Sequence, residues 1–242
     1  PIVIMPPMLG LRPSEAGVSR IWQKPNGPLL LLGNASNSAA ALDGALPLVS
    51  VSHIVCAASS KNAQQLTKRA NPREVALTAF TVSDHLLEGQ VVDIAAVLAA
   101  PLAAIADAMS PSPLSFAEGG AAGAGGGERA VLVHCDLGVN RSPTITLAFL
   151  VQAGHTLRAA YRHVLRARPG IDPLPGYRHG LREFELKVRG AQSVAHDEHF
   201  ALHFAELLAL VEDGEASEAD ATAKALALRE NAIEQLLKEP EE

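Results

Sequence analysis

Short apolar runs alternate with polar stretches in the first half of the chain, whereas apolar residues recur at helical spacing in the second half. Short aliphatic or β-branched runs bounded by turn residues are typical of buried strands. They predict strands at residues 28–33, 49–57, 74–82 and 129–134. Helical spacing predicts helices at residues 37–45, 91–109, 142–152, 157–166 and 176–189. Strands alternating with helices, then helices alone, indicate an α/β core followed by a helical C-terminal part.

Two further stretches divide the chain. Residues 110–128 read SPSPLSFAEGGAAGAGGGE, a composition that buries little, and they predict a flexible insertion between a helix and a strand. Residues 191–242 predict two amphipathic, acidic helices that are separated at Asp213-Gly214. We therefore expect an extended segment over residues 1–17, a core domain over 18–190 and a helical C-terminal extension over 191–242.

Composition narrows the classes of function. The 242 residues are 48% hydrophobic and 19% charged, with a formal net charge of −6, which fits a folded protein without a bulk positive field for nucleic acid. Two cysteines are too few for a disulfide framework or a zinc cluster. No run has the length of a membrane span, and the opening PIVIMPPMLG lacks the basic start of a signal peptide. We expect a cytoplasmic protein, with the nucleus as an alternative, that uses neither membrane nor nucleic acid.

One of the two cysteines lies in the stretch HCDLGVNRS, residues 134–142, between a predicted strand and a predicted helix. A loop at a helix N-terminus presents backbone N–H groups and the positive end of the helix dipole. Gly138 lets such a loop turn tightly around an anion. Arg141 follows Cys135 at a spacing that lets its guanidinium hold two phosphate oxygens. The same positive surroundings favour a nucleophilic thiolate at Cys135.

The neighbours of Cys135 complete a candidate phosphate-binding loop. Its cradle of backbone amides is predicted to come from Asp136, Leu137, Gly138, Val139, Asn140 and Arg141. The Ser142 hydroxyl is placed to stabilise the sulfur as a leaving group, and His134 to shape the loop through a backbone hydrogen bond rather than to act as a base. A lone cysteine on a strand is usually a small buried apolar residue, but the combined spacing of these residues favours the catalytic interpretation.

These residues resemble the cysteine-dependent protein tyrosine phosphatase superfamily, and its dual-specificity branch most closely. The similarity extends beyond the loop and covers roughly residues 18–188. It is carried by Ser19-Arg-Ile with Leu30-Leu-Leu-Gly33-Asn, by Ser52-His-Ile-Val55, by Ser83-Asp84-His85, by Arg168-Pro169-Gly-Ile171, and by Gly176-Tyr177 through Phe184-Glu185. The resemblance implies a central mixed, mainly parallel sheet flanked by helices, to which this chain adds its C-terminal extension.

The resemblance also implies a mechanism that needs no metal and no other cofactor. Cys135 would be the nucleophile, Arg141 the phosphate clamp and Asp84 the general acid, because Ser83-Asp84-His85 looks like the acid-bearing loop of the branch. Asp84 as an ordinary turn residue is the alternative. Asp93 is a second candidate acid, although it lies within a predicted helix.

Two loop residues depart from the common pattern of the branch. Asn140 stands before Arg141, where many dual-specificity members carry serine, and an asparagine at this place resembles the RNA 5′-triphosphatase branch. The continuation Arg141-Ser-Pro, in contrast, is typical of protein phosphatases. Asp136 adds a negative charge that is expected to repel polyphosphorylated head groups and to oppose thiolate formation slightly, unless its side chain points to solvent.

Other polar residues give weaker hypotheses. Cys56 ends the strand that should neighbour the one before Cys135, so reversible disulfide protection of the nucleophile competes with a plain buried cysteine. His196, His199 and His203 have the spacing of one helical face, which indicates a solvated polar face more strongly than a metal site. The stretch with Arg158, Arg162, Arg166 and Arg168 is expected to be mostly helix surface, with Arg168 near the core.

The sequence therefore predicts a hydrolase that removes phosphate from tyrosine, and also from serine or threonine, of a phosphoprotein substrate. The alternatives are a phosphatase of the same fold acting on RNA 5′ ends or another non-protein phosphate, or a non-catalytic phosphate-binding module. The intact set of Cys135, Arg141 and Asp84 favours an enzyme over a binding module.

Overall fold

The computed structural model describes residues 17–23, 27–46, 49–69, 75–82, 92–110, 128–211 and 217–240. Within these ranges one five-stranded sheet has the order β1-β2-β5-β3-β4. The strands are β1 (Ser19–Gln23), β2 (Leu29–Gly33), β3 (Val49–Cys56), β4 (Ala76–Ala79) and β5 (Glu128–His134). β1 pairs with β2 antiparallel, and the other three pairings are parallel. The mixed, mainly parallel sheet is therefore confirmed.

The central strands are apolar throughout because both faces of the sheet are covered. Side chains alternate across a strand, so Leu30 and Leu32 of β2 join one core while Leu29 and Leu31 join the other. Val131 and Val133 of β5 lie on the first of these faces. This explains why the run Leu29–Leu32 needs no polar alternation.

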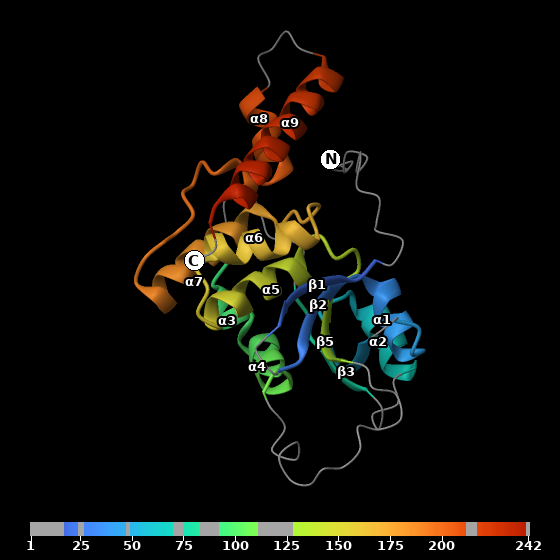
Figure 1. Ribbon diagram of the computed structural model, residues 1–242. Helices are drawn as coiled ribbons and strands as arrows, with labels where there is room; N and C mark the ends of the chain where they lie inside the picture. The colour runs from blue at the N-terminus through green and yellow to red at the C-terminus, as the bar shows by residue number, and fades with distance from the viewer. Residues whose placement is uncertain are drawn as a thin grey trace.

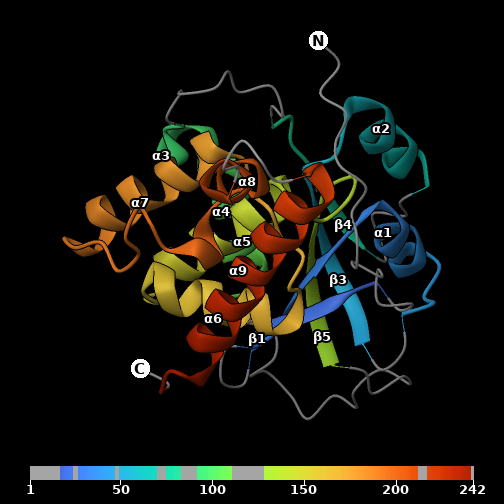
Figure 2. The same ribbon diagram turned by 90° about the horizontal axis from the view of Figure 1, so that it is seen from above.

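Helices cover the sheet unequally. The described helices are α1 (Ala35–Leu42), α2 (Ser60–Arg69), α3 (Ile94–Val97), α4 (Ala99–Ala108), α5 (Arg141–Gln152), α6 (Leu157–Ala167), α7 (Pro175–Arg189), α8 (Phe204–Val211) and α9 (Glu218–Lys238), with a 3-10 turn η2 (His199–Ala201). α1 and α2 lie on one face of the sheet, and the remaining helices gather on the other (Figure 2). The larger core therefore lies on the α5 side.

α5 is the central helix of that larger side, since every residue from Arg141 to Val151 is buried. Its buried hydroxyls are satisfied locally: Thr144 donates to the carbonyl of Asn140 at 2.8 Å and Thr146 to that of Ser142 at 2.9 Å. The N-terminus of this helix follows β5 after a loop of only six residues, 135–140. The loop is thus fixed between a central strand and a buried helix.

The C-terminal extension packs on the helical side of the core. α9 crosses α6 on the side that faces away from the sheet, and α8 lies next to α9 (Figure 1). The two predicted helices of the extension are present, one on each side of residues 212–216, which lie outside the described residues. Residues 190–203 are not α-helical, so the expected helical face of the three histidines was wrong. None of the described helices combines the length and apolar character needed to cross a membrane.

Some element boundaries differ from the predictions. Residues 91–109 were expected to be one helix, but α3 ends at Val97 and α4 begins at Ala99. Pro101 has no N–H to donate to the carbonyl of Val97, so a continuous helix loses a hydrogen bond there. β4 is shorter than the expected 74–82 because only Ala76–Ala79 pair with β3. The predicted insertion at 110–128 falls mainly on residues 111–127, outside the described residues, and the domain boundaries stay a prediction.

Candidate active site at the end of the central strand

Cys135 lies directly after β5, where the carboxyl ends of three parallel strands meet. β5 lies between β2 and β3, so the loops after Gly33 and Cys56 flank Cys135 on its two sides. The amide of Ala35 donates to the carbonyl of Asp136 at 3.2 Å, which connects the loop after β2 to the loop after β5. Crevices at the carboxyl ends of parallel strands are the usual binding sites of such sheets. The topology therefore places Cys135 where a ligand is expected.

The sulfur of Cys135 accepts two hydrogen bonds. The backbone amide of Gly138 lies 3.2 Å from Sγ, and the hydroxyl of Ser142 lies 3.1 Å from it. Only 2% of Cys135 is exposed, so little water competes for these contacts. Both donors direct positive charge at the sulfur, which is the arrangement that a negatively charged sulfur requires. The position expected for Ser142 is the one observed.

Gly138 makes the tight loop sterically possible. Its φ is +73°, in the left-handed region that a residue with a Cβ adopts only at a cost. A Cβ there would lie 2.6 Å from the carbonyl oxygen of Gly33 and 2.6 Å from Nη2 of Arg168. Gly138 is therefore required both by the backbone conformation and by the space around it.

Arg141 begins α5 and is held by a carboxylate of the same loop. Its Nη2 lies 2.7 Å from Oδ2 of Asp136, and the two side chains are 8% and 23% exposed. The Asp136 carboxylate also accepts the amide of Ser59 at 2.9 Å and a short hydrogen bond from the side-chain amide of Asn62. Burial acts to raise the pKa of Asp136, but the hydrogen bonds from Asn62, Arg141 and Ser59 outweigh it and keep that pKa below its ordinary value.

The Asp136 charge is therefore engaged rather than directed at solvent. It is balanced by Arg141 and fixed to the start of α2. Sequence patterns do not predict the contacts of Asp136 with Ser59 and Asn62, because these residues lie more than 70 positions from it along the chain. The expected repulsion of polyphosphates by Asp136 is accordingly weakened.

Arg168 supports the outer side of the loop. Its Nε donates to the carbonyl of Gly138 at 2.8 Å and its Nη2 to that of Leu137 at 3.3 Å. Its Nη1 reaches the carbonyl of Gly17 at 3.0 Å. Burial lowers the pKa of Arg168. The backbone turn between Leu137 and Gly138 is thus held from outside by one guanidinium.

Two more hydrogen bonds fix the residues just before Arg141. The amide of Asp172 donates to the carbonyl of Val139 at 2.7 Å. The amide of Leu174 donates to Oδ1 of Asn140 at 3.0 Å. The asparagine at position 140 therefore has a structural explanation, since its side chain accepts a hydrogen bond from the connection between α6 and α7.

His134 has the backbone partner that was expected. Its Nδ1 lies 3.2 Å from the carbonyl oxygen of Cys135. Only 1% of the side chain is exposed, and burial lowers its pKa to about 4. A histidine with that pKa is neutral at neutral pH. Its position behind the loop fits a shaping role.

Comparison with known proteins identifies the loop and the helices that follow it. Residues 123–187 match the family model described as dual specificity phosphatase, catalytic domain. Over 57 residues the chain is 40% identical to mouse dual specificity protein phosphatase 19, which is 23% of this chain and 26% of that protein. Over 60 residues it is 43% identical to human dual specificity protein phosphatase 9, or 24% and 16% of the two chains. The similarity to dual-specificity phosphatases is therefore carried by the loop after β5 and by the helices that follow it.

The matches cover part of the relatives only, because this chain spans about a quarter or less of both curated phosphatases. Among solved structures, human DUSP28 is 25% identical, with a TM-score of 0.47. That alignment covers 72% of this chain and 95% of the other. The matched residues 123–187 contain the whole Cys-x5-Arg loop, α5, α6 and α7 up to residue 187.

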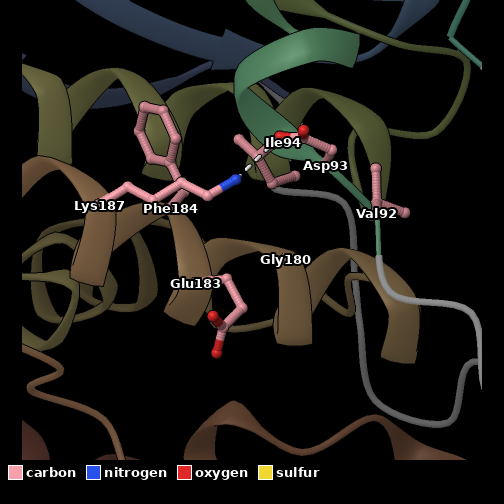
Figure 3. A pocket seen from close by; sticks show the side chains of 7 residues that line it. All are labelled: Val92, Asp93, Ile94, Gly180, Glu183, Phe184 and Lys187. Carbon is pink, nitrogen blue, oxygen red and sulfur yellow. Dashed lines mark ion pairs between the residues drawn. The ribbon is translucent and has the colours of Figure 1, made fainter.

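Asp84, the residue expected to be the general acid, lies outside the described residues. Asp93, the second candidate, has a structural task instead: its carboxylate caps α3 by accepting the amide of Ala95 at 3.1 Å. It also pairs with Lys187 of α7 at 3.5 Å. Figure 3 shows this pair at a hollow of about 180 Å³ between α3 and α7, lined by Val92, Asp93, Ile94, Gly180, Glu183, Phe184 and Lys187. No residue of the loop lines it.

The second cysteine ends the strand next to β5. Cys56 pairs in register with His134, the residue before the nucleophile candidate, and is fully buried. Burial raises the pKa of its thiol, and the charges of Asp136 and Cys135 act in the same direction. The two cysteines are free and lie on neighbouring strand ends.

The histidines of the C-terminal extension, His196, His199 and His203, do not form one cluster. His196 packs edge-on against His179 of α7 with ring centroids 5.3 Å apart, whereas His203 lies 3.3 Å from Asp172. His199 begins η2. Among the residues that the structure describes, no group of three His, Cys, Asp or Glu side chains is placed to bind a metal.

The arginine stretch was predicted mostly as helix surface, and for two residues this was wrong. Arg158 pairs with Glu198 and Glu239 at 2.6 Å each. Arg162 is 5% exposed and donates to the carbonyl of Pro240 at 2.6 Å. Both arginines bind the C-terminal extension, which α6 alone cannot reveal.

Proposed function

We propose that this chain is a protein phosphatase that hydrolyses phosphotyrosine, and also phosphoserine or phosphothreonine, through a cysteinyl-phosphate intermediate. The observation that supports this most is the donor arrangement at Cys135, whose sulfur accepts the Gly138 amide and the Ser142 hydroxyl inside the Cys-x5-Arg loop. A loop with a free cysteine, a backbone amide directed at its sulfur and an arginine suits attack on a phosphate ester.

In the first step the Cys135 thiolate attacks phosphorus. The bond between phosphorus and the ester oxygen breaks as the Sγ–P bond forms, and the departing oxygen takes a proton from Asp84. Arg141 and the amides of residues 136–141 bind the phosphoryl oxygens and stabilise the charge of the transition state. Asp136 keeps the Arg141 guanidinium oriented by the contact at 2.7 Å.

In the second step water hydrolyses the intermediate. A water oxygen bonds to phosphorus, the Sγ–P bond breaks, and the water proton returns to Asp84. The Ser142 hydroxyl, 3.1 Å from the sulfur, stabilises the thiolate that leaves. His134 takes no part in proton transfer, since its lowered pKa of about 4 leaves it neutral and its ring lies behind the loop.

A single experiment tests this function. The purified protein is assayed on an aryl phosphate with wild type, Cys135→Ser and Asp84→Ala, and tungstate binding is measured by calorimetry. We expect Cys135→Ser to lower turnover at least about a thousandfold while retaining tungstate binding, since the loop amides remain. Asp84→Ala should slow turnover strongly and flatten the pH profile of kcat. Full activity of Cys135→Ser would exclude the mechanism.

The substrate class is tested by a matched panel. Phosphate release from phosphotyrosyl, phosphoseryl and phosphothreonyl peptides is compared with release from triphosphorylated RNA and a phosphoinositide. Preference for the peptides supports a protein phosphatase, whereas faster release from RNA or lipid would reassign the substrate. Tungstate binding without any turnover would instead indicate a phosphate-binding module.

We also propose that Cys56 protects the nucleophile against oxidation. Peroxide would convert the Cys135 thiolate to a sulfenic acid, and the sulfur of Cys56 would displace its hydroxyl as water to form a disulfide. The neighbouring strand ends favour this, while the raised pKa of the buried Cys56 thiol makes the step slow. Mass spectrometry after peroxide treatment should find a Cys56–Cys135 peptide. Equal recovery of activity by Cys56→Ser would contradict the proposal.

A further inference from the structure

The connection between α6 and α7 contacts the phosphate-binding loop directly. Two of its amides, those of Asp172 and Leu174, donate to the Val139 carbonyl and the Asn140 side chain at 2.7 and 3.0 Å. Val139 and Asn140 are the two residues that precede Arg141 in the chain. A shift of this connection therefore moves the backbone from which the phosphate clamp projects.

The carboxylate of Asp172 points the other way, into the C-terminal extension. Its Oδ1 lies 3.3 Å from Nη1 of Arg229 in α9, and its Oδ2 lies 3.3 Å from Nε2 of His203. The amide of Phe204, the first residue of α8, donates to Oδ2 at 3.4 Å. Arg229 also donates to the carbonyl of Ile171, one residue before Asp172. The backbone amide of Asp172 thus contacts the loop, while its carboxylate contacts the C-terminal extension.

Arg229 is the partner that balances the charge of Asp172. The side chains of Arg229 and Asp172 are 12% and 18% exposed, so the pair is largely shielded from water. Burial lowers the pKa of His203, which keeps this histidine neutral near pH 7 and limits it to a hydrogen bond. Removing Arg229 would leave the partly buried Asp172 carboxylate without the guanidinium that contacts it, a change expected to cost more than losing an exposed surface pair.

A second ionic contact of the extension provides a comparison within the same molecule. Arg158, in the first turn of α6, pairs with Glu198 and with Glu239 at the end of α9, both at 2.6 Å. The hydrogen bonds that Arg158 donates go to Ser193, Glu198 and Glu239, which belong neither to the phosphate-binding loop nor to the α6–α7 connection. Figure 2 shows α9 crossing α6. These two ionic contacts attach the extension at different places, and of the two the Arg229–Asp172 contact is the one that is continuous with the loop.

We propose that Asp172 is a positioning residue for phosphate binding, through which Arg229 of the C-terminal extension sets the geometry of Val139, Asn140 and hence Arg141. The proposal rests on the phosphatase function proposed above only for its kinetic readout. It assigns the extension a task beyond stability: docking of α9 fixes the phosphate-binding loop in its binding conformation.

The test compares Arg229→Gln with Arg158→Gln in the full chain. Each variant removes one cation that docks the extension, so both should lower Tm. We expect Arg229→Gln to raise KM for an aryl phosphate and to weaken tungstate binding by about tenfold each, with a smaller change in kcat. Arg158→Gln should leave both values within about twofold, since its pair is separate from the loop.

Asp172→Asn provides a second variant that keeps the backbone amide donating to Val139 while removing the carboxylate charge. It should reproduce the rise in KM, and the double variant with Arg229→Gln should be no worse than either single change. Equal effects of Arg158→Gln and Arg229→Gln on tungstate affinity would overturn the proposal, as would a lowered Tm with unchanged KM in both Arg229→Gln and Asp172→Asn. If wild type bound tungstate without turnover, the proposed function would fail, while the tungstate comparison would still decide this inference.

Discussion

The two sides of the phosphate-binding loop are built differently. On the inner side, the sulfur of Cys135 contacts Gly138 and Ser142, which lie three and seven positions away along the chain. On the outer side, the loop carbonyls are held by Arg168 and Asp172, about thirty positions away. The hydrogen bonds to the sulfur are therefore encoded in one short stretch, whereas the geometry of that stretch depends on the α6–α7 connection. Substitutions on the two sides of the loop should therefore differ in how strongly they change activity and stability.

The largest effect is expected where the two sides meet, at Gly138. Gly138→Ala forces a Cβ into the space held by the Gly33 carbonyl and Arg168, at a φ of +73°. Because the loop must shift to make room for this Cβ, we expect kcat/KM to fall by about a hundredfold or more. Steady-state kinetics on an aryl phosphate measures it.

Gly190→Ala is the matched control. Gly190 also has a positive φ, +78°, at the end of α7, but nothing lies within 4 Å of its added Cβ. It should lose about 1 kcal/mol of stability with unchanged kcat/KM. An equal loss of kcat/KM in Gly138→Ala and Gly190→Ala would mean that the loss does not depend on the contact between the added Cβ and Gly33.

The next effect concerns pH and the buried imidazole behind the loop. The pKa of His134 is lowered by burial to about 4 from an ordinary 6.5, so the unfolded state binds a proton more readily than the folded state. Stability therefore falls as pH drops from about 7 to 5, by about 2 kcal/mol for this group. Chemical denaturation of wild type and His134→Gln at both pH values measures it. The variant should lose less stability on acidification, and parallel losses would contradict the prediction.

A smaller effect is expected at Asp136, on the side of the loop that faces α2. Its folded pKa lies below the ordinary value, so its contribution is present above about pH 3.9 and is lost as pH falls through the folded pKa. Asp136→Asn should cost about 1 kcal/mol of unfolding free energy at pH 7 and less near pH 3. Denaturant titrations at the two pH values test this. An undiminished difference near pH 3 would show that charge is not the cause.

The smallest effect should come from an ion pair outside both sides of the loop. Arg69 pairs with Asp43 at 2.8 Å, but their side chains are 48% and 59% exposed. Asp43→Asn should therefore change the unfolding free energy by less than about 0.5 kcal/mol. A change as large as that of Asp136→Asn would remove the distinction between the engaged loop carboxylate and a solvated surface pair.

The sequence pattern was sufficient for strands β2, β3, β4 and β5 and for the inner side of the loop, but it did not predict β1. Apolar runs such as Leu29–Leu32 predicted strands because their residues are buried on both faces, and the spacing of Cys135 to Ser142 predicted the contact with the sulfur. These features depend on neighbours in the chain, which a pattern can represent.

The remaining features depend on distant partners. The roles of Arg158 and Arg162 were predicted wrongly because helical spacing does not show that α9 covers α6. The anchoring of Asp136 by Asn62 and the link from Asn140 to Leu174 likewise join separate elements. The histidines of residues 196–203 followed a helical spacing without a helix, since η2 interrupts this stretch. Periodicity cannot distinguish a helix from an irregular segment fixed by tertiary contacts.

The direction of β5 has a consequence for how the chain can change in evolution. The strand starts at Glu128 and ends at His134, so its two ends are roughly 20 Å apart. Residues 111–127 join the strand at the start, opposite the end that carries Cys135. Length can therefore be gained or lost at this junction without changing the register that positions the nucleophile. The same junction is a suitable place to graft a foreign sequence.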